Sequence, residues 1–291
     1  MKSKWKNKIH AVYFSSRKHF DLLYISLNSL RLLNLPFLGC IYLYIDKSDF
    51  LTDRQFKLLN RLRLTLKIRE VNKVTQSGEM LIYTELRAFK DISEEVSPED
   101  YMAKIDSDVL FLSRDIFLEV LRSNKDVIGQ ECNVWDPFIY FQGGCYFIKC
   151  ALVPNIVSFD KDLPEKVLKY MNSIAIKKGY MPMTSCPEDA FIYHIIKARS
   201  ESIRLTDFYG TWNDLFQFNK RISAIHFENV KKEDMWRLRG LEAIVTKNSY
   251  VRALILRLLI ILPRGVKATL RTMYDSWVMG KRKKNGTFIN S

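Results

Sequence analysis

Apolar and polar positions follow two alternating rhythms along the first 112 residues of the chain. Short apolar runs, typical of buried strands, alternate with longer stretches in which apolar residues return every three or four positions, as in helices. Repeated strand–helix units predict an α/β fold with a mostly parallel, Rossmann-like sheet covered by helices. The predicted strands are 9–14, 40–45, 66–71 and 101–111, and the predicted helices are 20–33, 52–62 (capped by Thr52) and 78–92.

After residue 113 the two rhythms continue less regularly. A change in composition near Val230 is the best candidate for a boundary, so we expect one main domain over residues 1–229 and a helical C-terminal extension over residues 230–291. The further predicted helices are 114–122, 165–178 and 188–198, and the further predicted strands are 127–131, 138–149, 203–205 and 224–227.

Charge is concentrated in the C-terminal extension. The formal net charge is +14, and residues 230–291 hold 14 Lys and Arg against 4 Asp and Glu. The second helix predicted there carries Leu270, Met273 and Trp277 on one stripe and Lys267 and Arg271 on another face. An apolar stripe beside a basic face suits a helix lying on an anionic membrane surface. The alternative is that the stripe packs against the main domain.

The overall composition is that of a globular protein, with 47% hydrophobic and 27% charged residues. The 5 cysteines are scattered and form no CxxC pair, which favours buried, reduced thiols. We see no secretion signal and no apolar segment long enough to cross a bilayer. These features predict a cytoplasmic protein, with the basic tail as its means of peripheral attachment to the inner face of the membrane.

The segment from Met102 to Leu112 places Asp106 and Asp108 one residue apart between strand-forming apolar runs. At the end of a strand, a local turn can direct both carboxylates at one point, and Mg²⁺ or Mn²⁺ prefers such oxygen ligands. The simpler interpretation is a pair of acids in a turn that ends the strand. Burying two carboxylates without a cation is costly, although Lys104 could supply one neutralising charge.

Three more features follow in order. Gln142, Gly143 and Gly144 lie inside a predicted strand, where glycine indicates a close approach of a ligand or of another backbone, or else a bulge. Glu188 and Asp189 open a predicted helix, where acids commonly act only as first-turn residues. His226 ends a short predicted strand, where a histidine is more often structural than a ligand.

Together, the Asp106-Ser-Asp108 motif, the Gln142-Gly-Gly144 run, the Glu188–Asp189 pair and His226 resemble the GT-A-fold glycosyltransferases over about residues 9–229. The resemblance implies a GT-A-like catalytic domain that uses Mn²⁺ or Mg²⁺ and takes a nucleotide sugar as donor. In it, Asp108 would bind the metal, Asp106 the metal or the donor ribose, and His226 the metal or the diphosphate.

The same resemblance assigns roles to the remaining candidates. Gly143 and Gly144, with Gln142, would line the sugar pocket, and Asp189, beside Glu188, would correspond to the catalytic base of inverting members. Arg87 matches a basic residue that often approaches the donor, and Tyr13 and Phe14 match the region that usually holds the nucleotide base. The text after His226 differs from the His-x-x-Gly-x-Lys-Pro-Trp motif common in retaining members. The stereochemistry is therefore left open, with inversion slightly preferred because the Glu188–Asp189 pair is present.

The implied function is transfer of a hexose-type sugar from a nucleotide diphosphate to a glycan or lipid-linked acceptor, in cell-surface polysaccharide or lipopolysaccharide synthesis. One rival is a catalytically inactive subunit that binds nucleotide sugars or serves as a scaffold. Another is a nucleic-acid-binding protein, suggested by the +14 charge, although the sequence holds no recognised RNA motif or Cys/His finger. A metal-dependent phosphohydrolase is a third, in which the Gly-Gly and Glu-Asp features would have no role.

Overall fold

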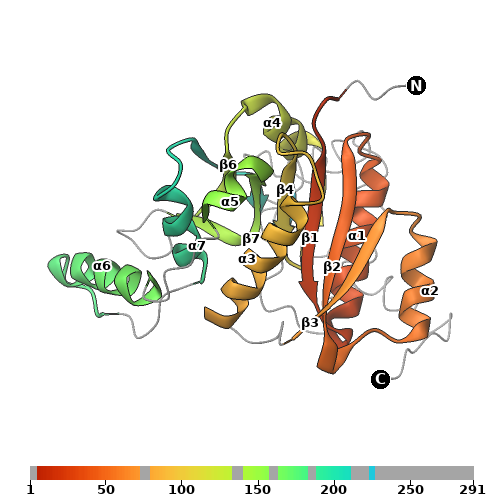
Figure 1. Ribbon diagram of the computed structural model, residues 1–291, viewed down its shortest axis with the longest axis horizontal. Coiled ribbons are helices and arrows are strands. Elements are labelled where there is room, and N and C mark those ends of the chain that lie inside the picture. The colour runs from red at the N-terminus through yellow and green to blue at the C-terminus, as the bar shows by residue number, and fades with distance from the viewer. Residues whose placement is uncertain are drawn as a thin grey trace, which may run out of the picture.

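The computed structural model describes residues 5–72, 79–132, 140–156, 163–182, 188–210 and 223–226. These residues form a seven-stranded sheet in the order β3-β2-β1-β4-β7-β6-β8 (Figure 1). The first four of these strands run parallel, while β7 is antiparallel to both β4 and β6. The predicted α/β fold with a mostly parallel sheet is therefore confirmed. The strands are β1 Ile9–Ser15, β2 Leu38–Asp46, β3 Leu66–Val71, β4 Tyr101–Ile105, β6 Val127–Cys132, β7 Tyr140–Lys149 and β8 Ile203–Thr206.

Helices cover both faces of the sheet because successive strand residues point to opposite sides. In β1, Ala11 and Tyr13 pack with α1, α2 and α4, whereas Val12 packs with α3, α5, α6 and α7. Helix α6 lies at one end of the molecule, beyond α7 (Figure 1). The helices are α1 Phe20–Leu33, α2 Asp53–Arg61, α3 Glu79–Ser93, α4 Asp115–Ser123, α5 Val153–Ile156, α6 Leu163–Lys177 and α7 Glu188–Lys197, with short 3-10 turns at Arg17–His19, Lys47–Asp49 and Cys150–Leu152.

The predicted cap at the start of α2 is confirmed. Thr52 caps α2 as predicted, in a reciprocal capping box with Gln55.

Within the described parts of the chain, no helix is long and apolar enough to cross a membrane. The predicted helical tail of residues 230–291, and with it the predicted boundary after residue 229, lies outside the described residues.

One predicted strand is divided in two. Residues 101–111 form β4, then a turn at 106–108, then β5 (Val109–Phe111), which belongs to a second sheet with β10 (Ala224–His226) and β9 (Tyr209–Gly210). The Val109 N–H donates to the Asp106 carbonyl and closes the turn. The prediction of one strand was wrong here because the apolar run continues on both sides of the acids, so periodicity alone does not reveal the change of sheet.

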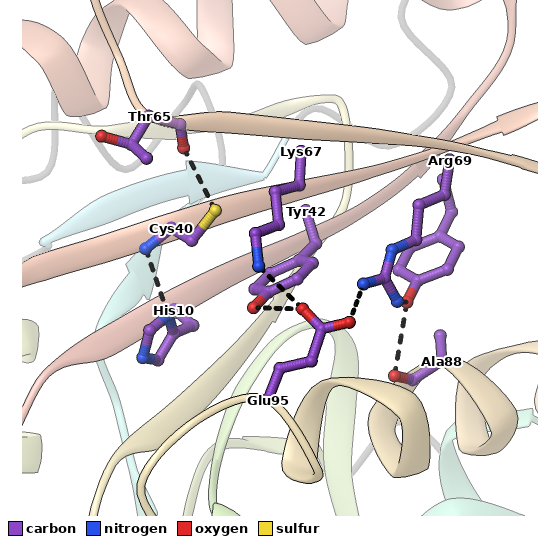
Figure 2. A network of polar contacts seen from close by, with 9 residues as sticks. His10, Cys40, Tyr42, Thr65, Lys67, Arg69, Ala88 and Glu95 are labelled. Atoms are coloured by element: carbon purple, nitrogen blue, oxygen red, sulfur yellow. Dashed lines mark hydrogen bonds and ion pairs between the residues drawn. The ribbon is translucent and has the colours of Figure 1, made fainter.

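A buried polar network around His10 lies at the amino ends of β1, β2 and β4, opposite the turn at residues 106–108. The His10 Nε2 lies 3.2 Å from the Asp100 Oδ2. The Cys40 N–H donates to the His10 Nδ1 at 3.1 Å, a contact that Figure 2 shows. Asp100 also accepts from the Lys8 N–H at 2.7 Å. Because Nδ1 is an acceptor here, the proton of the neutral ring is on Nε2, facing Asp100. This network joins β1, β2 and the loop before β4.

On the neighbouring surface of β2 and β3, charged side chains lie over tyrosine rings. Lys67 and Arg69 both lie near the Tyr42 ring, at 5.2 and 5.3 Å from its centroid, and both pair with Glu95 beyond α3 (Figure 2). The arrangement ties β3, at the edge of the sheet, to the end of α3. It therefore supports the sheet on the side opposite α1 and α2.

The buried His10 predicts a pH dependence of stability. Burial lowers the pKa of His10, while Asp100 acts to raise it and Lys8 and Lys67 to lower it. Because the pKa is lower in the folded than in the unfolded chain, the unfolded chain takes up the proton first as the pH falls. We expect the free energy of unfolding to be fully supported by neutral His10 above about pH 6.5 and to decline below it, by at most about 1.4 kcal/mol per pH unit.

Urea unfolding at pH values from about 7.5 to 5 measures this effect, with His10→Gln as the comparison. Glutamine retains a hydrogen-bond donor and acceptor but does not titrate in this range. The variant should show a shallower loss of stability with falling pH than the wild type. Equal slopes for the two proteins would rule out His10 as the titrating group.

Candidate functional site

The turn that carries Asp106 and Asp108 is anchored to the strands on both sides of β4. The Asp106 N–H donates to the Gly144 carbonyl of β7 at 2.8 Å, and the Ser107 hydroxyl donates to the Ser15 hydroxyl of β1 at 3.0 Å. The turn therefore lies where the parallel strands β1 and β4 end. Ligands in open α/β sheets bind beyond this carboxyl edge.

His226 reaches the same turn from a distant part of the chain. β10 pairs antiparallel with β5, and the register sets His226 opposite Val109, directly after the acids. The His226 Nε2 lies 3.3 Å from the Asp108 Oδ1 and 3.8 Å from the Asp106 Oδ2. The structure thus brings together three side chains that the sequence analysis proposed as one group.

These three side chains can hold a divalent cation. One ligand atom from each of Asp106, Asp108 and His226 lies within 4.8 Å of the other two, and all three residues are partly exposed. Carboxylate oxygens suit Mg²⁺ and Mn²⁺, and an added imidazole nitrogen favours Mn²⁺ or another transition metal. The donor set therefore fits the ion that the resemblance implies.

Gly144 and Gln142 position the His226 ring. A Cβ on Gly144 would lie 2.7 Å from the ring Cε1, which is closer than real Cβ contacts allow, so the imidazole sits where a side chain is missing. The Gln142 amide lies 3.4 Å from the His226 Nδ1. The nitrogen of this amide faces the ring and donates to Nδ1, which helps to fix the orientation of the imidazole. The predicted role of Gly143 and Gly144 in a sugar pocket stays a prediction.

Beneath the turn, Lys104 is almost fully buried and contacts Asp106. Its Nζ lies 2.7 Å from the Asp106 Oδ1, 2.7 Å from the Gly143 carbonyl and 3.5 Å from the Glu85 Oε1. The sequence analysis proposed Lys104 as a neutralising charge, and the structure confirms this contact. It missed Glu85, whose place on the inner face of α3 no local motif indicates.

His19 is a second imidazole on this side of the molecule that the sequence analysis missed. It precedes α1, and partial removal from solvent lowers its pKa, with Lys18 acting in the same direction. Asp108 acts against this lowering, as does Asp49. Asp108 therefore contacts His226 and also acts electrostatically on His19. The only signal in the sequence was the position of His19 shortly after the first strand.

The two residues predicted to hold the nucleotide base, Tyr13 and Phe14, point to opposite faces of the sheet. Tyr13 is fully buried on the α1 face of the sheet, where its hydroxyl bonds to the Ser26 hydroxyl at 2.9 Å, so its ring offers no surface to a base. Strand alternation turns Phe14 to the other face, where it is half-buried and stacks on Tyr44 with 5.2 Å between ring centroids. Phe14 alone of the pair is accessible to a ligand.

The remaining candidates lie on α3 and α7. Arg87 is exposed on α3, and because residues two apart on a helix do not face each other, it points away from the side on which Glu85 reaches Lys104. The described part of α7 runs from Glu188 to Lys197, so Glu188 and Asp189 lie at the amino end of that part. Their side chains lie outside what the structure describes, and their catalytic role stays a prediction.

Comparisons with known proteins support the fold. No protein-family model and no curated protein matches the sequence. Among solved structures, the galactosyltransferase LgtC in complex with donor and acceptor sugar analogues is similar, with a TM-score of 0.53, 11% identity, and coverage of 83% of this chain and 98% of that one. The glycosyltransferase GlyE of Streptococcus pneumoniae TIGR4, in its apo form, gives a TM-score of 0.50 at 14% identity, with coverage of 87% of this chain and 63% of that one. The chain has the GT-A glycosyltransferase fold, as the sequence predicted.

The close approach of Gly144 to His226 predicts the effect of Gly144→Ala. The added methyl group should displace the imidazole and weaken Mn²⁺ binding by about 10-fold or more, the range seen when a residue that orients a metal ligand is changed. Titration with Mn²⁺, followed by the EPR signal of the free ion, measures the affinity.

Gly129→Ala is a matched control for this substitution. A Cβ at Gly129 would meet Phe141 at 2.5 Å, in the same sheet but without contact to His226. Both variants should lose stability, and only Gly144→Ala should lose Mn²⁺ affinity. Equal affinities for the two variants would show that the His226 ring position does not matter for the metal.

Proposed function

We propose that this protein is a metal-dependent glycosyltransferase that moves a hexose-type sugar from a nucleotide diphosphate donor to a glycan or glycolipid acceptor. The observation that carries the proposal is the convergence of Asp106, Asp108 and His226 at the carboxyl edge of a GT-A-type sheet. Fold alone does not specify chemistry, because one fold can host many functions. The proposal therefore rests on what these side chains can do.

The three side chains would hold Mn²⁺ or Mg²⁺ at the point where the leaving group of the donor departs. A bound divalent ion supplies stabilisation of the diphosphate charge without proton transfer. The protein's own contribution is to orient these side chains. The turn fixes the two acids, Gly144 leaves room for the His226 imidazole, and Gln142 bonds to the Nδ1 of that ring. Such preorganisation is the main way in which an enzyme stabilises developing charge.

Asp189 is the proposed general base, with Glu188 beside it at the amino end of the described part of α7. In an inverting transfer, the base accepts the proton of an acceptor hydroxyl while that oxygen bonds to the anomeric carbon and the nucleoside diphosphate leaves from the opposite face.

The C-terminal segment supports a further proposal about location. Its excess of Lys and Arg with an apolar stripe suits attachment to an anionic membrane, where a lipid-linked acceptor in polysaccharide or lipopolysaccharide synthesis would be found.

Donor hydrolysis tests the proposed activity without knowledge of the acceptor, because water can take its place. A panel of nucleotide sugars incubated with the protein and Mn²⁺ should release the free sugar and nucleoside diphosphate from one donor, and EDTA should stop the release. Asp108→Ala should reduce the rate by at least about 100-fold, whereas Asp53→Ala, at the start of α2, should leave it unchanged. Donor binding without turnover in the wild type would instead favour the inactive binding subunit.

Asp189→Asn tests the proposed base. The amide retains the shape of the side chain but cannot accept the proton, so transfer to the acceptor should fall by about 100-fold or more while donor affinity changes little. Proton NMR of the product, once an acceptor is found, assigns its anomeric configuration. A retained configuration, or full transfer activity in the variant, would remove Asp189 from this role.

A further inference from the structure

Lys104 occupies an unusual position for a lysine. It lies on β4 with its side chain 6% exposed, on the sheet face that α3 covers. Buried lysines are rare because the charged group loses its hydration, and they persist only where partners replace the water. An apolar side chain would pack there at less cost, so the lysine calls for a reason beyond packing.

The ammonium group has three hydrogens, and three acceptors from different elements surround it. Asp106 lies in the turn after β4, Gly143 contributes its carbonyl from β7, and Glu85 reaches in from α3. The two closest contacts, at 2.7 Å, are with Asp106 and Gly143, while the fully buried Glu85 lies at 3.5 Å. A lysine serving only as partner to a buried acid would be expected closest to that acid, and this one instead lies closest to the site.

Lys104 also makes the two oxygens of the Asp106 carboxylate unequal, because it bonds to one of them. Oδ1 accepts from the lysine, and Oδ2 is the oxygen that faces the His226 Nε2, at 3.8 Å. The side chain of Asp106 is 39% exposed, so without the lysine the carboxylate could turn toward solvent. The contact leaves one oxygen for a cation and sets the direction in which it points.

We propose that Lys104 is a positioning residue that presents Asp106 to the metal through a single oxygen, with Glu85 as the counter-charge that makes a lysine tolerable beside a cation site. This inference rests on the proposed function, because it assumes that Asp106, Asp108 and His226 hold a metal. It adds two residues to the site, neither of which touches the cation.

Geometry and electrostatics predict opposite results when Lys104 is removed. A positive charge near a cation site repels the cation, so on charge alone Lys104→Met should tighten Mn²⁺ binding. If orientation of Asp106 dominates, the same substitution should weaken it. Replacing Glu85 by glutamine removes one of the two negative charges beside the lysine and leaves its hydrogen bonds to Asp106 and Gly143 in place. Glu85→Gln should therefore weaken Mn²⁺ binding by a few-fold through repulsion.

The decisive variant is the double substitution Lys104→Met with Glu85→Gln, because it removes the lysine together with the buried negative charge of Glu85 that lies 3.5 Å from it. We expect its dissociation constant for Mn²⁺ alone to rise by about 10- to 100-fold, as is typical when a residue that orients a metal ligand is lost. The Mn²⁺ concentration giving half-maximal donor hydrolysis should rise by a similar factor. Lys104→Arg, which retains the charge and the donors, should recover part of the affinity.

Leu59→Ala on α2 separates positioning from stability. Leu59 is buried in the core on the far face of the sheet, so its truncation lowers the melting temperature without touching the site. This control should bind Mn²⁺ like the wild type even if it is as unstable as the double variant. The comparison uses the full chain, with EPR of free Mn²⁺ and thermal unfolding as its two measurements.

The outcomes separate the two proposals. Wild-type Mn²⁺ binding together with unchanged or tighter binding in the double variant would overturn the inference and leave the proposed function standing. Equal weakening in the double variant and in Leu59→Ala would also overturn it, because loss of stability would then explain the effect. Failure of the wild type to bind Mn²⁺ would overturn the proposed function and this inference with it.

Discussion

Two carboxylates one residue apart repel each other, and the structure around them is arranged to make that pair tolerable. Lys104 compensates Asp106 from below at 2.7 Å, and the His226 imidazole lies 3.3 Å from Asp108 on the other side. These two partners of the acids come from different parts of the chain. β4 carries the lysine, and β10 returns from more than 100 residues away to pair with β5. Without the pairing of β10 with β5, His226 would not lie beside Asp108.

The same two acids lie at the point where the chain passes from one sheet to the other. β4 belongs to the seven-stranded sheet and β5 to the three-stranded one, so the turn between them lies where the two sheets meet. Its backbone is held by Gly144 and its serine by Ser15, which removes the freedom that a surface turn usually has. The side chains proposed as metal ligands are therefore positioned by the fold itself. Fixing them in advance lowers the entropy cost of binding and limits which ions fit.

The two ends of the parallel strands have different tasks. At the amino end, His10 bonds to Asp100 and to the Cys40 N–H, and the His10 and Asp100 side chains are buried. At the carboxyl end, Asp106, Asp108 and His226 remain partly exposed. Buried, fully paired groups hold the sheet together, while the partly exposed ones stay available to a ligand. This polarity is expected of α/β sheets that bind ligands at the carboxyl edge.

The sequence by itself determined the order of strands and helices, the α/β class and the acids at the end of the fourth strand, because period-2 and period-3.6 patterns are local properties of the chain. It also identified His226 and the two glycines as candidates, but not the reason for Gly144, which is the ring that lies against it. Only the tertiary structure decided that the run 101–111 crosses between sheets, that Tyr13 is a core residue, and that Glu85 sits beneath the site. Those facts depend on which strands pair and on which face each side chain points to, and such contacts between distant segments leave no periodic trace in the sequence.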